Sequence, residues 1–340
     1  MGTVTIKDIA QKAGVSISTV SRVINGNYPV SKDVRKRVQK VMGELDFHPN
    51  AIARSLRSRK SNLVGFIIAD LSNQFFMDVA KGLEKEVGKL GKQLLIVSSD
   101  NEPEKESKII NALIERNIDG LVIASSGGAS LKAIQKCLDK DIPVVLIDRY
   151  FEEVKTAQIL WDDFSISQAL VERLIASGHS RIAIVNVMLS NPTGKERLDG
   201  YLYALMKAGI DKDDTLISGS NFGPDEAYQF VKNVFSSPDR PSAIYCVNNQ
   251  MAFGAIKAFH ELELTIGKDV SMVLFGNLIA QNYYPLDITH ANQDGVSMGS
   301  IAGQTLIEAM ESGSVENRRV IIDSPIVDKS SIQKMEGWRQ

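Results

Sequence analysis

The strongest constraint on the fold comes from residues 5–26, where two apolar stripes at helical spacing flank Gly14. The first stripe covers 6–13 and the second covers 20–24. Glycine readily adopts the positive φ that commonly ends a helix, so the chain is expected to turn sharply at Gly14 and start again. The stretch therefore predicts a helix, a tight turn and a second helix.

The second of these helices has an unusual outward face. An ordinary solvated face would carry Glu and Lys, whereas short hydroxyl side chains let a helix approach a groove closely. A plain amphipathic hairpin is the alternative, but a basic third helix over 31–45, N-capped by Ser31, follows at once. We therefore interpret the second helix as a recognition helix. Its outward residues are Ser16, Ile17, Ser18, Ser21 and Arg22.

Charge is distributed unevenly along the chain. Residues 1–60 contain 12 Lys and Arg against 4 Asp and Glu, a formal charge of +8. The whole chain carries −2, which leaves −10 on the remaining 280 residues. A charge run alone usually marks a solvated surface, but here it coincides with the predicted helix-turn-helix. A polyanion-binding headpiece on an acidic body explains both observations.

From residue 62 the pattern changes to short runs of Val, Ile and Leu that alternate with helical segments. Such strands are typical of parallel sheets buried on both faces. The number of strands is large for one sheet, so we expect two doubly wound halves with a ligand cleft where their strand ends face each other. The expected strands are 63–69, 94–98, 120–124, 144–148, 158–161, 181–187, 243–247, 271–275 and 288–291.

Specific motifs connect this chain with a known family. They are Thr5-Ile6-Lys7-Asp8-Ile9-Ala10, Ala13-Gly14-Val15-Ser16, Thr19-Val20-Ser21-Arg22-Val23-Ile24-Asn25, His48-Pro49-Asn50-Ala51 and Ala53-Arg54-Ser55-Leu56. In these stretches, and more weakly over most of the chain, the sequence resembles the lac repressor/galactose repressor family. The resemblance implies an N-terminal all-α helix-turn-helix headpiece and an α/β core, similar to periplasmic binding proteins, of two doubly wound parallel-sheet subdomains. It also implies a homodimeric repressor that binds a pseudo-palindromic operator in double-stranded DNA and is switched by a small metabolite.

The same resemblance supplies the expected domain boundaries. The headpiece would cover 1–47, a hinge segment 48–61, and the effector-binding and dimerisation core 62–340. Within the core, the expected parts are a first subdomain of 62–160 and 291–322, and a second subdomain of 161–290 and 323–340.

The hinge contains a short helical segment after Pro49. Residues 50–57 make about two turns, which is too short for a stable helix in water. By resemblance, this helix orders on DNA, and Leu56 of each subunit wedges between base pairs in the minor groove. A plain flexible linker is the alternative. The predicted DNA contacts are Thr5, Ser16, Ile17, Ser18, Thr19, Ser21, Arg22, Asn25, Ser31, Asn50, Ala53 and Leu56.

The sequence lacks the motifs of the common enzymes. It has no G-x-S-x-G elbow, Walker A loop, H-E-x-x-H or C-x-x-C, and its four histidines lack metal-ligand spacing. Cys137 and Cys246 are expected to be reduced core thiols, and His179 is expected to be structural. No catalytic residue, cofactor or metal is expected, and the missing signal peptide and membrane span indicate a cytoplasmic protein. A solute-binding protein or a metabolic enzyme is the alternative that these absences disfavour.

Matching the family's effector pocket residue by residue places the expected ligand contacts near strand ends. Arg197 is the strongest candidate, because an Arg on a helix facing the cleft has little structural reason to point there. Phe75 and Phe76 could equally serve the core or a dimer contact. The predicted effector contacts are Phe75, Phe76, Ser125, Asp148, Arg149, Thr193, Arg197, Phe222, Asn248, Gly276 and Gln293.

Two departures from the family pattern bear on the effector. Phe275-Gly276-Asn277 stands where the family typically has Phe-Asp-Asp, and Asn248-Asn249 stands where it often has Asn-Asp. Fewer carboxylates beside Arg149 and Arg197 would leave the cleft more positive, and an ionised partner strengthens each hydrogen bond to Arg. We therefore predict a sugar acid, such as 2-keto-3-deoxygluconate, as the effector, with a neutral sugar as the alternative.

Overall fold

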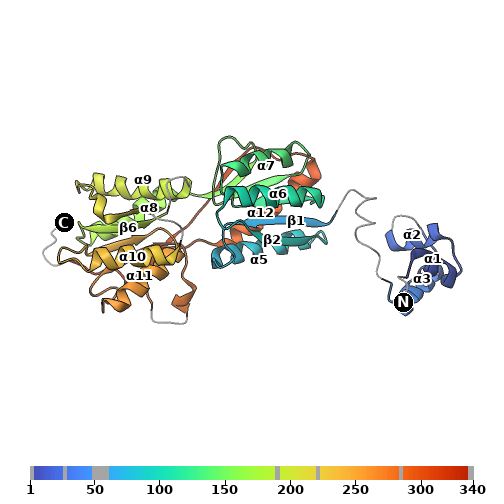
Figure 1. Cartoon of the computed structure of the whole chain (residues 1–340), viewed down its shortest axis with the longest axis horizontal. Helices are drawn as coiled ribbons and strands as arrows, with labels where there is room; N and C mark the ends of the chain where they lie inside the picture. Colours follow the sequence, from blue (N-terminus) through green and yellow to red (C-terminus); the bar gives the residue numbers. More distant parts are fainter. Residues whose placement is uncertain are drawn as a thin grey trace. The chain divides into compact units, whose positions relative to one another are not determined.

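The computed structural model describes residues 4–25, 29–47, 61–187, 192–219, 223–282 and 286–335. The chain forms two compact units, Met1–Ser61 and Asn62–Gln340 (Figure 1). No helix in the described ranges is long and apolar enough to cross a membrane. The predicted contacts that lie outside these ranges are Asn50, Ala53, Leu56 and Phe222.

The described part of the first unit is a small helical core. Its helices are α1 (Ile6–Ala13), α2 (Ile17–Asn25) and α3 (Lys32–Glu44). Ile9, Val20 and Val38 contribute one fully buried side chain from each helix. Gly14 ends α1 at a φ of 63°, which lets the chain turn at once into α2. The predicted helix-turn-helix is thus confirmed, although Ser31 makes no capping hydrogen bond with its side chain.

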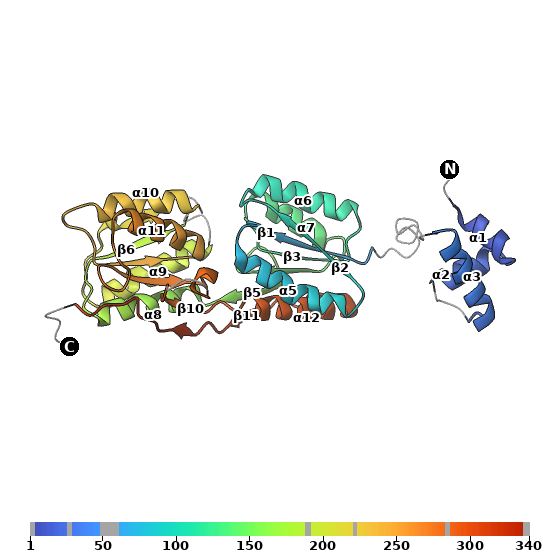
Figure 2. The ribbon, with the colours of Figure 1, turned by 90° about the horizontal axis from the view of Figure 1, so that it is seen from below.

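The second unit consists of two lobes, each built on a six-stranded sheet (Figure 2). In the first lobe the strand order is β11-β5-β4-β3-β1-β2, with all neighbours parallel. Its strands are β1 (Leu63–Ile68), β2 (Gln93–Ser98), β3 (Gly120–Ile123), β4 (Val144–Ile147), β5 (Ala157–Trp161) and β11 (Arg319–Ile322). Its helices are α5 (Gln74–Gly88), α6 (Pro103–Glu115), α7 (Ala129–Leu138) and α12 (Gly295–Ser312).

The second lobe repeats this plan with the order β12-β10-β9-β8-β6-β7, and only the β10–β12 pair is antiparallel. Its strands are β6 (Ile182–Asn186), β7 (Ile217–Gly219), β8 (Ala243–Cys246), β9 (Ser271–Phe275), β10 (Thr289–Ala291) and β12 (Ile326–Val327). Its α-helices are α8 (Asp163–Ala176), α9 (Pro192–Lys207), α10 (Pro224–Phe235) and α11 (Asn249–Glu261), and its 3₁₀ turns are η1 (Asp214–Leu216) and η2 (Ile279–Asn282).

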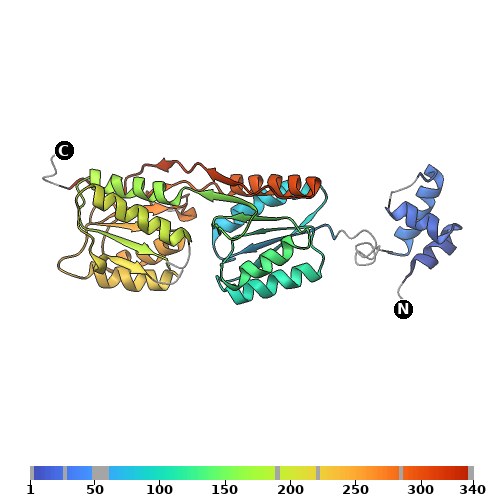
Figure 3. The same ribbon diagram turned by 90° about the horizontal axis from the view of Figure 1, so that it is seen from above.

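Helices cover both faces of the sheets (Figure 3). In the first lobe, α5 and α12 pack on one face and α6 and α7 on the other, so that adjacent residues such as Phe66 and Ile67 belong to different cores. Close contact between α5 and α12 requires glycine, since a Cβ on Gly299 would lie 2.0 Å from the carbonyl oxygen of Val79. The predicted architecture of two doubly wound parallel-sheet subdomains is confirmed.

The chain passes between the lobes three times, after β5, after β10 and after β11. The nine predicted strands are all present, and β7, β11 and β12 are additional. The prediction missed these three because they are short strands at sheet edges, with three residues in β7, four in β11 and two in β12. In β11, exposed and half-buried residues alternate, as expected for a strand at the edge of a sheet.

Candidate functional site

The recognition face of α2 begins with a cluster of hydroxyl groups. The Ser16 Oγ accepts the backbone N–H of Thr19 at 3.1 Å, so Ser16 caps the helix. The same Oγ lies 2.7 Å from the Ser18 Oγ and 2.8 Å from the Thr19 Oγ1. Ile17 is 46% exposed, and Arg22 also faces solvent. An apolar side chain, small hydroxyls and one guanidinium therefore stand at the surface of one short helix.

The other predicted DNA contacts lie around this face. Thr5 is exposed at the start of α1, where its backbone N–H and its hydroxyl both donate to the Asp8 carboxylate at 2.7 Å. Ser31 is exposed just before α3, Ser21 is half-buried, and Asn25 is the last residue of α2. The exposed hydroxyls thus mark the starts of all three helices, where backbone N–H groups favour a phosphate.

The second unit contains a polar cleft with about 600 Å³ of empty space, open to solvent and lined by residues of both lobes. Its lining follows the carboxyl ends of strands, as the doubly wound topology requires. The predicted residues that line it are Phe75, Phe76, Asp148, Arg149, Thr193, Arg197, Asn248 and Gln293. The prediction missed Ala69, Asp70, Asn73, Asn101, Val187, Asn249 and Gln250. All of these lie within five residues after the end of β1, β2, β6 or β8, so strand ends alone would have indicated them.

Two predicted effector residues do not line the cleft. Ser125 is fully buried and donates to the Glu106 carboxylate at 2.7 Å. Gly276 adopts a φ of 101°, and a Cβ there would lie 2.6 Å from the Oε1 of Gln293. Glycine at position 276 therefore makes room for the Gln293 amide, which takes the place in the lining that a side chain at 276 would occupy.

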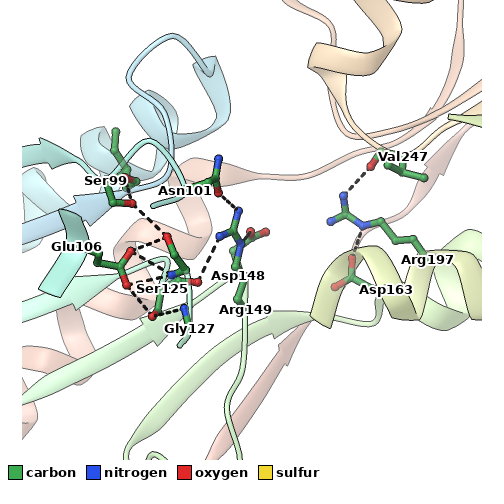
Figure 4. A network of polar contacts seen from close by, with 12 residues as sticks. Ser99, Asn101, Glu106, Ser125, Gly127, Asp148, Arg149, Asp163, Arg197 and Val247 are labelled. Carbon is green, nitrogen blue, oxygen red and sulfur yellow. Dashed lines mark hydrogen bonds and ion pairs between the residues drawn. The ribbon is translucent and has the colours of Figure 1, made fainter. Parts of the chain in front are cut away.

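Arg197 reaches the cleft from α9 in a fixed orientation. Its Nε donates to the Asp163 carboxylate at 2.7 Å, and its NH1 donates to the carbonyl of Val247 at 2.6 Å (Figure 4). Its guanidinium carbon lies 3.8 Å from the centre of the Phe275 ring. Arg197 and Asp163 are both buried, which means that the ion pair is shielded from water. These contacts supply the structural reason for the orientation of Arg197 that the sequence did not indicate.

Arg149 faces Arg197 from the first lobe (Figure 4). Its NH2 donates to the Asn101 Oδ1 at 2.7 Å and its NH1 to the Ser125 carbonyl at 3.3 Å. Burial lowers the pKa of Arg149, while the Asp148 and Glu106 carboxylates favour its charged form. The Asp148 carboxylate lies 3.9 Å from its Nε.

The lining contains as many carboxylates as guanidinium groups, and the expectation that it is more positive than in the family pattern stays a prediction. Asp70 and Asp148 stand against Arg149 and Arg197 among the lining residues. Asp163 lies directly beneath Arg197 as a further carboxylate. The fold therefore brings other carboxylates to the guanidinium groups, in place of those that the sequence lacks at Gly276 and Asn249.

Within the described residues, no group of three or more His, Cys, Asp or Glu side chains is arranged to hold a metal ion. His179 is buried, with its Nδ1 at 2.7 Å from the Ser242 Oγ and its Nε2 at 3.1 Å from the Gln333 carbonyl. Cys137 and Cys246 are buried free thiols, and burial raises the pKa of Cys137 to about 12. These three side chains are buried and do not belong to the cleft lining.

A two-lobed ligand-binding core together with a helix-turn-helix headpiece defines a ligand-responsive DNA-binding protein. Residues 61–329 match the family of periplasmic binding proteins and the sugar binding domain of the LacI family. Residues 5–50 match the bacterial regulatory proteins of the lacI family. The chain belongs to the LacI family, and it is a DNA-binding transcriptional regulator rather than an enzyme.

Relatives match along nearly the whole chain. The HTH-type transcriptional repressor PurR of Vibrio atlanticus is 30% identical, over 97% of this chain and 99% of that protein. The ribose operon repressor of Haemophilus influenzae is 27% identical, over 98% and 99%. Among solved structures, the lac repressor dimer bound to operator and an anti-inducer has a TM-score of 0.84 at 24% identity, over 98% of this chain and all of that one. A complex of the regulator CelR with cellobiose has a TM-score of 0.71 at 23% identity, over 96% and 99%.

Proposed function

We propose that this chain acts in the cytoplasm as a homodimeric repressor of a pseudo-palindromic operator, and that a small polar metabolite in the cleft sets its affinity for DNA. The observation that carries the proposal is the placement of Arg149 and Arg197, one from each lobe, in the lining of one cleft. A ligand that touches both arginines favours one relative orientation of the lobes over others. The lobes are therefore the switching element.

The headpiece would read DNA through α2 in the major groove. Ile17 and Ser18 would reach base edges, and Arg22 would make a bidentate contact with a guanine. The remaining headpiece contacts would hold phosphates and so fix the register on the duplex. These are Thr5, Ser16, Thr19, Ser21, Asn25 and Ser31. The hinge residues Asn50, Ala53 and Leu56 would bind the minor groove, with Leu56 as the wedge.

The cleft suits a ligand rich in hydroxyl groups. Amide side chains are frequent in its lining, and each amide offers both donors and an acceptor. Phe75 and Phe76 supply apolar surface against which a sugar ring packs. Two of the similar proteins are a ribose operon repressor and a regulator whose structure is a complex with cellobiose, which agrees with this chemistry. The amide residues are Asn73, Asn101, Asn248, Asn249, Gln250 and Gln293.

The proposal further concerns the charge of the effector, which is either a sugar acid or a neutral sugar. A sugar acid, such as 2-keto-3-deoxygluconate, would place its carboxylate on the guanidinium of Arg149 or Arg197. The balanced lining favours the second candidate, a neutral sugar, because Asp148 and Asp163 already offset the two arginines. Comparing the binding of a sugar with that of its acid, such as glucose and gluconate, separates the two candidates.

The proposal is tested in two steps with the full chain. Selection from random duplex DNA identifies an operator, and we expect a two-fold symmetric site whose binding weakens steeply with salt. A thermal-shift panel that contains ribose, cellobiose, glucose, gluconate and 2-keto-3-deoxygluconate then identifies the ligand class. A ligand at a hundred times its Kd adds about 2.7 kcal/mol to the free energy of unfolding. Selection that enriches no common sequence would refute the operator-binding function.

A further inference from the structure

One amide-to-amide hydrogen bond joins the two lobes at the cleft. Asn249, the first residue of α11 in the second lobe, donates from its Nδ2 to the Oδ1 of Asn73 in the first lobe at 2.9 Å. Both residues line the cleft, and Asn249 is only 9% exposed. The contact is thus largely shielded from water and also lies within reach of a bound ligand.

Helix α5 fixes the direction of this hydrogen bond. Asn73 is the N-cap of α5, and its Oδ1 accepts the backbone N–H of Phe75 at 3.1 Å. Because a backbone N–H can only donate, the oxygen of Asn73 must face it, and Asn249 must supply the NH₂ group. A side chain at position 249 that can only accept hydrogen bonds would face the Oδ1 of Asn73 and be repelled by it.

A second approach between the lobes lies outside the cleft lining. Burial raises the pKa of Tyr150, which follows β4 in the first lobe, and the nearby Glu196 carboxylate on α9 in the second lobe raises it further. The Arg319 guanidinium lies 4.5 Å from the centre of the Tyr150 ring. Tyr150 and Glu196 do not line the cleft. Of these two approaches, a bound ligand therefore competes directly only with the Asn73–Asn249 hydrogen bond.

We propose that the Asn73–Asn249 hydrogen bond is a latch that sets the orientation of the lobes in the effector-free protein, and that Asn249 is the positioning residue through which the cleft regulates DNA binding. The latch itself is a property of the core. Its effect on DNA rests on the proposed function. A hydrogen bond between neutral groups shifts an equilibrium by roughly 2- to 10-fold, and an ionised acceptor makes the bond about twice as strong.

Two Asn→Asp substitutions should change the strength of the hydrogen bond between the lobes in opposite directions. In Asn73→Asp, the carboxylate still caps α5 and accepts a stronger, charge-assisted hydrogen bond from Asn249. In Asn249→Asp, the carboxylate is tolerated in the first turn of α11 but cannot donate to Asn73. Gln229→Glu is the matched control, because it adds the same charge to the second lobe at an exposed position of α10 that does not line the cleft.

The lobe orientation can be measured by pulsed electron resonance on the full chain without DNA or effector. Spin labels on Lys132→Cys in α7 and His260→Cys in α11 occupy exposed positions in different lobes. The native thiols Cys137 and Cys246 are buried and remain unlabelled. We expect N249D to broaden the distance distribution, N73D to narrow it, and Q229E to leave it unchanged. A shift of N73D and N249D in the same direction, or no shift with N249D, would overturn the latch.

Operator affinity provides the second readout. N73D and N249D should move the operator Kd in opposite directions, each by roughly 2- to 10-fold. Opposite changes in distance with an unchanged operator Kd would overturn the regulatory role of Asn249. Absence of operator binding by the wild-type chain would count against the proposed function instead, and the distances would still decide the latch.

Discussion

Arg197 and Asp163 form a buried ion pair, with the guanidinium Nε 2.7 Å from the carboxylate oxygen. Burial raises the pKa of the Asp163 carboxyl to about 7, although Arg197 favours its ionised form. Burial alone would lower the pKa of Arg197, but Asp163 and Asp148 raise it above its ordinary value. Arg197 therefore stays charged and is held in one orientation toward the cleft. The two residues act as a unit, and removing either one should affect both folding and ligand binding.

The first prediction concerns Arg197→Ala. Removing one partner of a buried ion pair leaves an uncompensated charge, so we expect the free energy of unfolding to fall by about 3–5 kcal/mol at pH 8. The double variant R197A/D163N should recover part of this loss, because no ion is then left buried. Both variants should lose the response to the effector. Urea denaturation and effector titrations measure the two effects separately, and a single variant as stable as the wild type would contradict the role of the pair.

The second prediction concerns Arg22→Ala. If Arg22 makes a bidentate contact with a guanine, its loss should cost about 1–3 kcal/mol and relax one position of the operator. Lys36→Ala, at an exposed position of α3, is the control that should weaken binding evenly across sequences. Fluorescence anisotropy with single-base operator variants measures both the loss of affinity and the change in base preference. An R22A protein with unchanged affinity and unchanged base preference would exclude this contact.

The third prediction concerns Leu56→Ala in the hinge. A wedge contributes by deforming one kinkable base step rather than by charge. We therefore expect L56A to weaken operator binding while binding to random DNA and its salt dependence stay nearly unchanged. Competition between operator and random duplex DNA measures the ratio of the two affinities. Equal losses in both modes would show that residues 50–57 are only a tether.

The fourth prediction concerns His179 and pH. A carbonyl can only accept, so Nε2–H must donate to Gln333 and Nδ1 must accept from the Ser242 hydroxyl. Burial lowers the pKa of His179 below its ordinary value. The unfolded chain therefore takes up a proton first as the pH falls below about 6.5, and the stability present above that pH is progressively lost.

Unfolding curves at several pH values test this assignment. His179→Gln should flatten the decline in stability below about pH 6.5, whereas His260→Gln, at an exposed position of α11, should leave it as in the wild type. A decline of the same size in H179Q would place the titrating group elsewhere in the chain.

The fold was largely predictable because its signals are local. The stripe around Gly14 marks the helix-turn-helix, and buried strands such as β3 and β8 are continuous apolar runs. The edge strands β11 and β12 depend on tertiary pairing, and with four and two residues they are too short to give a clear signal.

The site was predictable only in part. Residues such as Arg149 and Asn248 follow strands, and their positions place them at the cleft. The partners of these residues come from distant segments, as with Asp163 beneath Arg197 and Asn73 beside Asn249. Such pairings contribute to the charge around the cleft, and the sequence gives no local signal for them.

The most direct test of the account is a reciprocal titration of operator and effector. The operator Kd is measured with and without saturating effector, and the effector Kd is measured on the free protein and on the operator complex. Coupling through the lobes must be reciprocal, so an effector that weakens operator binding tenfold, about 1.4 kcal/mol, must itself bind tenfold more weakly to the operator complex. Equal effector affinities for the free protein and for the complex would contradict the account.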